Sequence, residues 1–147
     1  MHLLLEGTEI FNIARERVFQ MVTDVGFIAE QISEGRSIKV REGNTIEAQM
    51  KLKVLPPGIT MSTKIRVVNI EHARSARLEV EGSGARSTLK VISDFGLEGE
   101  NPTRMKWTAD VEITGEMARF GSDRIRRLTQ KVVKEIFYGI RRSMDEG

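Results

Sequence analysis

Histidine is the side chain best suited to proton transfer and metal binding near neutral pH, and the sequence contains only two, His2 and His72. His2 lies next to the amino terminus, and His72 lies in a segment typical of a turn. Neither has a carboxylate or a second histidine at the spacing of a metal site. We therefore assign no catalytic or metal-binding role to either side chain.

Other kinds of reactive site are also missing from the sequence. There is no cysteine, which excludes disulfides, thiolate zinc sites and a cysteine nucleophile. The G-x-S-x-G motif, the phosphate-binding loop and the HExxH zinc motif do not occur. Gly82-Ser83-Gly84 could bind an anion, but a hairpin turn between two strands explains the same residues. The sequence predicts no catalytic residue, no metal and no cofactor, and hence a protein that is not an enzyme.

Three polar residues, Glu9, Thr63 and Ser93, fall in register with apolar neighbours and should face the interior. A hydroxyl can bond to its own backbone, so Thr63 and Ser93 need no special role. A buried carboxylate without a partner is costly. Glu9 could therefore mark the mouth of a cavity or meet an arginine, but the favoured interpretation is a bulge or a strand end that turns it toward water.

The elements that must position these residues follow from the spacing of apolar side chains. Strict alternation predicts strands at Ile46–Val54, Ile59–Val67, Leu78–Val80, Leu89–Leu97 and Met105–Ile113. Turns are predicted at Gly43-Asn44, Pro56-Pro57-Gly58, His72–Ser75, Gly82–Gly84 and Gly99–Pro102. A further strand is expected at Leu3–Ile13, and a shorter one near Ser37–Arg41. Strands with one apolar face and tight turns indicate an antiparallel sheet.

Helical spacing appears in three places. Two short helices are predicted at Ala14–Thr23 and Phe27–Ile32. A long helix begins near Met117 or Ser122, with an apolar stripe of Ile125, Leu128, Val132, Ile136 and Ile140. Gly115 and Gly121 flank the change of spacing and permit the chain to turn back across the sheet. The fold class is therefore α+β: a curved seven-stranded antiparallel sheet wrapped around a long C-terminal helix, with two short helices between strands 1 and 2.

Composition sets the remaining limits. We expect a single domain over residues 1–147, because this length supports one core. No segment approaches the ~20 apolar residues that span a bilayer, and the start MHLLLEGTEIF is no signal peptide, so a cytoplasmic protein without stable membrane insertion is expected. Lys and Arg exceed Asp and Glu by only 23 to 21, which does not favour nucleic acid as a partner.

Several segments together carry a family likeness. They are LEGTEIF, ARERVF, TDVGFIAEQI and, most specifically, WTADVEITGEMARFGSDRIRRL, followed by VVKEIF. The chain resembles the carbon monoxide dehydrogenase G-subunit family of the START-like (SRPBCC, helix-grip) superfamily, from Leu5 to about Ile140. This resemblance implies a binding or accessory protein with an apolar cavity, linked in some members to a molybdenum hydroxylase and its quinone acceptor.

The preferred hypothesis is a cavity between sheet and C-terminal helix that holds a hydrophobic small molecule, such as a lipid or a quinone-like compound. A helix laid across a curved sheet leaves unfilled space, and flexible methionines suit adaptable apolar walls. The predicted ligand-pocket residues are Phe11, Ile28, Met50, Leu52, Met61, Ile65, Val91, Trp107, Val111, Phe120, Ile125, Leu128 and Val132. A less favoured alternative is an enzyme of the cyclase or hydrolase type on the same fold.

A basic surface on the last helix supports a further alternative. Arg119, Arg126, Arg127, Lys131 and Lys134 could bind an anionic partner, either lipid headgroups or an acidic protein. Under this hypothesis the chain is an accessory subunit that docks on a carbon monoxide dehydrogenase-like oxidoreductase. An ordinary solvated helix face explains the same charges. Only Tyr138 offers an exposed ring for base stacking, so nucleic acid is not expected there.

Overall fold

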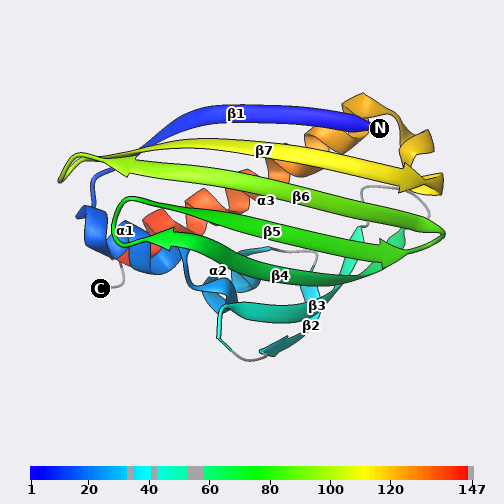
Figure 1. Ribbon diagram of the computed structural model, residues 1–147, viewed down its shortest axis with the longest axis horizontal. Helices are drawn as coiled ribbons and strands as arrows, with labels where there is room; N and C mark the ends of the chain where they lie inside the picture. The colour runs from blue at the N-terminus through cyan, green and yellow to red at the C-terminus, as the bar shows by residue number, and fades with distance from the viewer. Residues whose placement is uncertain (33–34, 41–42, 53–57, 146–147) are drawn as a thin grey trace.

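The computed structural model describes residues 1–32, 35–40, 43–52 and 58–145 of the chain. Figure 1 shows one curved sheet with a long helix behind it. The strands are β1 (His2–Phe11), β2 (Gly35–Val40), β3 (Thr45–Leu52), β4 (Ile59–Glu71), β5 (Ser75–Gly84), β6 (Ser87–Glu98) and β7 (Thr103–Gly115). The helices are α1 (Arg15–Val22), α2 (Val25–Gln31), the 3₁₀ helix η1 (Glu116–Phe120) and α3 (Ser122–Asp145).

The described strands form one antiparallel sheet in the order β1-β7-β6-β5-β4-β3-β2. Consecutive strands are neighbours except at β1, which pairs with the last strand, β7. α3 runs along the sheet on the side that α1 and α2 also cover (Figure 1). The predicted α+β class, the curved antiparallel sheet and the long C-terminal helix are confirmed.

Two glycines allow the chain to pass from β7 into α3, as predicted. Gly115 and Gly121 have φ of 89° and 88°, a region that residues with a side chain rarely adopt. A Cβ atom at Gly115 would also lie only 2.1 Å from the carbonyl oxygen of Arg86. η1 lies between these glycines and α3 starts directly after them, so the later of the two predicted helix starts is the correct one.

The predicted turn at Gly82–Gly84 is wrong. These residues belong to β5, and the hairpin turns instead at Ala85 and Arg86, with φ of 50° and 56°. Gly82 and Gly84 are small for another reason, because other strands approach them closely. A Cβ atom at Gly82 would lie 3.2 Å from Thr63 Cγ2, and one at Gly84 would lie 2.4 Å from the Thr60 carbonyl oxygen.

Other predicted boundaries differ by several residues. β4 continues to Glu71, β5 is much longer than Leu78–Val80, and β1 ends at Phe11 rather than Ile13. Polar residues at these ends continue the ladder although the apolar alternation stops there. The turn at His72 is confirmed, whereas Pro56 and Pro57, Lys53 and Val54, and Arg41 lie outside the described residues.

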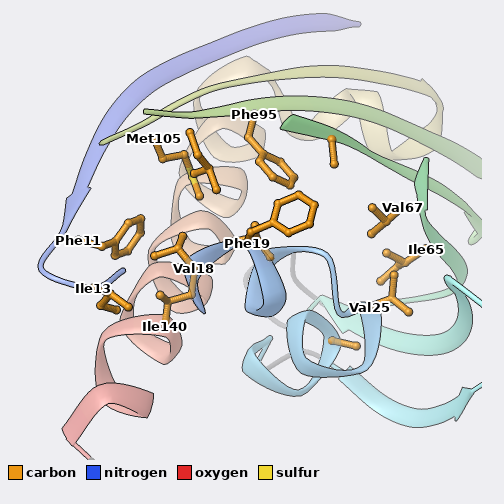
Figure 2. Close-up of a cluster of buried hydrophobic side chains, with 14 of the residues drawn as sticks. Phe11, Ile13, Val18, Phe19, Val25, Ile65, Val67, Phe95, Met105 and Ile140 are labelled. Carbon is orange, nitrogen blue, oxygen red and sulfur yellow. The ribbon is translucent and has the colours of Figure 1, made fainter. Parts of the chain in front are cut away.

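The interior contains two apolar clusters. The first joins α1, α2 and the C-terminal half of α3 to β1 and to β3–β7, and Figure 2 shows Phe11, Val18, Phe19, Phe95 and Ile140 converging there. The second joins β1, β3, β4, β7 and η1 to the start of α3. The first cluster contains the buried rings of Phe11, Phe19 and Phe95 among aliphatic side chains, whereas the buried residues of the second are aliphatic or methionine. The candidate site lies beneath α3.

Candidate functional site

A cavity of about 170 Å³ lies between the inner face of the sheet and α3. Its walls come from α2, β3 to β7, η1 and α3, so nearly every element contributes. The predicted pocket residues that line it are Ile28, Met50, Leu52, Met61, Ile65, Val91, Val111, Ile125, Leu128 and Val132. The cavity wall also contains residues that were not predicted to line it: Ile32, Thr63, Leu78, Val80, Leu89, Ser93, Ala109, Ile113, Met117, Thr129, Val133 and Ile136. Most of these share the same period-2 or helical spacing, which could have identified them.

The cavity wall contains no charged side chain among the described residues. Its polar members are Thr63, Ser93 and Thr129. Each hydroxyl donates to a backbone carbonyl: Thr63 to Ala48 at 2.8 Å, Ser93 to Thr108 at 2.8 Å and Thr129 to Ile125 at 2.9 Å. The donors are therefore satisfied within the protein, although Thr63 and Ser93 bond to the neighbouring strand rather than to their own backbone. What the wall offers a ligand is apolar surface and a few spare oxygen lone pairs.

The size of the cavity limits what it can hold without rearrangement. Pockets for drug-sized ligands typically measure about 300 to 1,000 Å³, which exceeds the roughly 170 Å³ found here. A dry apolar cavity of about 150 Å³ is enough for one benzene molecule. The space therefore matches a single ring or a short branched chain. Met50, Met61 and Met117 line it, and their flexible side chains can adapt to different shapes.

The chain matches one known protein family over most of its length. The family described as the G subunit of carbon monoxide dehydrogenase (CoxG) matches residues 7–145. The chain belongs to this family. The resemblance noted from the sequence is thereby confirmed. Comparison with curated protein sequences finds no significant match for this CoxG-family chain.

Solved structures share the fold at low sequence identity. A conserved protein from Geobacillus kaustophilus matches with a TM-score of 0.87 and 16% identity, over 98% of this chain and 96% of that one. Ara h 8.0201 matches with a TM-score of 0.72 and 17% identity, over 100% of each chain. The Zhui aromatase/cyclase from Streptomyces sp. R1128 matches with a TM-score of 0.70 and 10% identity, over 99% and 94%. At these identities the likeness establishes the helix-grip fold alone.

Three predicted pocket residues of this CoxG-family chain do not line the cavity: Phe11, Trp107 and Phe120. Phe11 is fully buried in the first apolar cluster, where its ring meets that of Phe137 edge-on at 5.9 Å. Trp107 also packs on Phe137, at 5.9 Å, and lies across Gly7. Phe120 packs against the second cluster from η1. The prediction that these three side chains line the pocket is therefore wrong.

Glu9 meets an arginine, which is the less favoured of the interpretations of this residue. Arg141 on α3 donates from Nη2 to Glu9 Oε1 at 2.5 Å and to the carbonyl oxygen of Ile10 at 3.0 Å. Its guanidinium also lies 4.8 Å from the centre of the Phe11 ring. Arg141 thus joins the end of α3 to the end of β1 and lies outside the cavity wall.

Both histidines lie outside the cavity wall. His2 contacts Asp110, and His72 Nε2 lies 2.9 Å from Glu16 Oε2 while its ring packs edge-on against Phe19. Among the described residues, no three His, Asp or Glu side chains gather in a way that could hold a metal ion. On the outer face, the hydrogen bond to Asp94 raises the pKa of Arg77 above its ordinary value. These charged pairs are therefore surface features.

The predicted anionic-partner residues lie on η1 and on the solvent side of α3. Arg119, Arg127, Lys131 and Lys134 are exposed, and Arg126 is half-buried. Only Arg126 and Lys134 of this set line a common groove, between α3 and β1. Within the described part of the chain, no helix has the length and apolar character needed to cross a membrane.

Proposed function

We propose that this CoxG-family chain is a non-enzymatic binding protein that holds a hydrophobic small molecule between the sheet and α3. The observation that carries the proposal is the composition of the cavity wall. It combines aliphatic side chains from α2, five strands, η1 and α3 with hydroxyls whose protons are already bonded to backbone. Such a wall gains free energy mainly by removing apolar ligand surface from water.

The expected driving force follows from the area buried. At ~25 cal/mol per Å², each 100 Å² or so of ligand apolar surface contributes about 2.5 kcal/mol before the costs of association. A ring-sized group fits the cavity of about 170 Å³ as it stands. A longer lipid or an isoprenoid quinone would place one ring or one chain end there, and α2 or α3 would have to shift to admit the remainder.

The wall also supports binding over catalysis. Hydrolysis and cyclisation require a positioned acid or base within hydrogen-bond reach of the substrate. The described residues of the wall supply hydroxyls but no carboxylate, imidazole or amine. The Zhui aromatase/cyclase shares the fold, but function resides in the site rather than the fold.

The proposal is tested by the ligand content of the protein. Protein purified without detergent is denatured, extracted with organic solvent and analysed by mass spectrometry. Delipidated protein is then titrated with a ubiquinone of short chain, a medium-chain fatty acid and toluene, and binding is followed by calorimetry. Co-purifying apolar compounds or saturable binding of one probe supports the proposal. A ligand-free protein that binds none of the probes overturns it.

A second candidate is an accessory subunit that docks on a carbon monoxide dehydrogenase-like molybdenum oxidoreductase. It is favoured by the family description and by the exposed cations of η1 and α3. Reversing Arg126 and Arg127 to glutamate should then abolish capture of the oxidoreductase by the tagged chain, while ligand binding in the cavity is retained. Capture that persists in this variant argues against docking through the basic surface.

A further inference from the structure

A second recess lies outside the cavity, between the edge strand β1 and α3. This β1–α3 groove measures about 630 Å³. Trp107, Val133 and Phe137 give it an apolar floor, and Arg126, Lys134 and Tyr138 of α3 form one side. Leu4 and Glu6 of β1 lie on the opposite side. β1 is at the margin of the sheet in Figure 1, so the groove opens along a sheet edge.

The hydrogen-bonding pattern of β1 shows which of its backbone groups are free. Met1 and Ile113 exchange two bonds, each 2.8 Å long, so the odd-numbered residues of β1 pair with β7. Leu4, Glu6 and Thr8 therefore direct their N–H and C=O groups away from β7, toward the edge. The corresponding carbonyl of Ile10 already accepts a hydrogen bond from Arg141 Nη2, at 3.0 Å. The groove thus runs beside a short ladder of donors and acceptors that no other described residue binds.

Edge strands are normally protected against pairing with other chains. The usual means are charged side chains (especially lysine), proline, bulges, short length, or a helix or loop that covers the edge. β1 has ten residues without lysine or proline, and its register with β7 is continuous. Leu4 and Ile10 on this strand are 58% and 53% exposed, and Tyr138 across the groove is 64% exposed. This edge therefore has the features of a surface that another strand covers.

The charges on the groove indicate what the covering strand carries. Arg126 and Lys134 face it from α3, and neither has an ion-pair partner within the described part of the chain. Two carboxylates also line the groove: Glu9 is paired with Arg141, and Glu6 lies across the groove from α3, on the exposed side of β1. A strand added beside β1 would turn alternate side chains toward α3. Acidic and apolar side chains at those positions would match the two cations and the aromatic floor.

We propose that the β1–α3 groove is a docking site for an extended acidic segment of a partner protein, which adds to the sheet beside β1. The backbone groups of Leu4, Glu6 and Thr8 supply affinity independent of side chains, as in other cases of strand addition. Arg126 and Lys134 select for acidic residues, and Phe137 and Trp107 receive apolar ones. The site is separate from the ligand cavity and does not depend on it.

The test uses labelled eight-residue peptides that alternate Glu or Asp with Val, together with versions in which lysine replaces the acids. Binding is followed by fluorescence anisotropy, and amide exchange of Leu4, Glu6 and Thr8 by NMR. We expect the acidic peptides to bind and to protect these amides, and the lysine peptides to do neither. Arg126→Glu combined with Lys134→Glu should weaken binding roughly tenfold.

Two further variants separate this mode from general charge attraction. Thr8→Pro removes one free edge N–H without removing a bond to β7, so binding should fall, whereas Thr8→Val should bind normally. Arg127→Glu changes an exposed charge outside the groove and should have little effect. Absence of binding by all acidic peptides at about 1 mM overturns the proposal. The proposal is also overturned if Arg127→Glu weakens peptide binding as much as the double variant does, or if Thr8→Pro leaves peptide binding unchanged. A dimer of this chain in solution that pairs through β1 would overturn it as well.

Discussion

The side chain of Gln31, at the end of α2, lies directly against Gly139 of α3. A Cβ atom at Gly139 would lie 2.2 Å from Gln31 Oε1 and 2.5 Å from its Cδ. Gln31 is held in this position by a hydrogen bond from its Nε2 to the Phe27 carbonyl, 3.0 Å long. Gly139 therefore allows α2 to approach α3 closely, and α2 carries Ile28 of the cavity wall.

This contact predicts opposite effects of one substitution in two backgrounds. Alanine favours a helix over glycine by about 1 kcal/mol. In the natural sequence, Gly139→Ala should nevertheless destabilise the protein by about 1 kcal/mol, because Gln31 must leave its place and its hydrogen bond. In a Gln31→Ala background the same substitution should stabilise. A double-mutant cycle from urea unfolding measures the coupling, and a coupling near zero would contradict the close packing of α2 on α3.

Filling the cavity should weaken ligand binding while changing the stability of the protein little. Ala109 is buried on the cavity wall, and leucine there adds an isopropyl group within the space of about 170 Å³. We expect Ala109→Leu to change the free energy of unfolding by less than about 1.5 kcal/mol, since it fills a void. Its affinity for the apolar probe should fall by about tenfold or more.

The neighbouring residue on β7 provides the matched control for this experiment. Thr108 is half-exposed on the opposite face of the strand, outside the cavity wall. Thr108→Leu adds similar apolar bulk without entering the cavity, so its probe affinity should equal that of the natural protein. Unchanged affinity in Ala109→Leu would place the ligand elsewhere.

Alternation along strands predicted which face of each strand is buried, and for the cavity this was largely sufficient. Ile65, Val91 and Val111 line it because each lies in register with other inward-facing residues. The helical stripe similarly placed Ile125 and Leu128. The spacing of apolar residues alone therefore identified the two surfaces that face each other, the inner face of the sheet and the apolar stripe of α3. Whether a ligand occupies the space between them stays a prediction.

The spacing of apolar residues could not predict where α3 crosses the sheet. Trp107 and Val111 share the inner face of β7, yet only Val111 reaches the cavity. Trp107 instead meets Phe137, which lies further along α3 than Val132, the last residue predicted to line the pocket. The crossing depends on the curvature of the whole sheet and on the Gly139 contact with α2. Neither is encoded in the local spacing of residues.

The hairpin between β5 and β6 offers a direct test of the corrected turn. Ala85 and Arg86 both have positive φ, which asparagine and glycine adopt more easily. The double substitution Ala85→Asn with Arg86→Gly should therefore stabilise the protein by roughly 1 kcal/mol. Gly115→Ala should instead destabilise the protein strongly, because the new Cβ atom would lie 2.1 Å from the Arg86 carbonyl oxygen. Thermal unfolding measures both, and a loss of stability in the double variant would contradict the assigned turn.

The contacts of Arg141 predict that it stabilises the attachment of α3 to β1. Its guanidinium binds Glu9 and the Ile10 carbonyl and lies over the Phe11 ring. Both charged side chains are partly exposed, at 45% and 27%, so solvent screens the ion pair. Together with the ring contact, we expect Arg141→Ala to cost about 1 to 2 kcal/mol of unfolding free energy. Arg127→Ala, which removes an exposed arginine elsewhere on α3, should cost less than about 0.5 kcal/mol. Similar values for the two variants in urea unfolding would mean that Arg141 does not hold the helix to the strand.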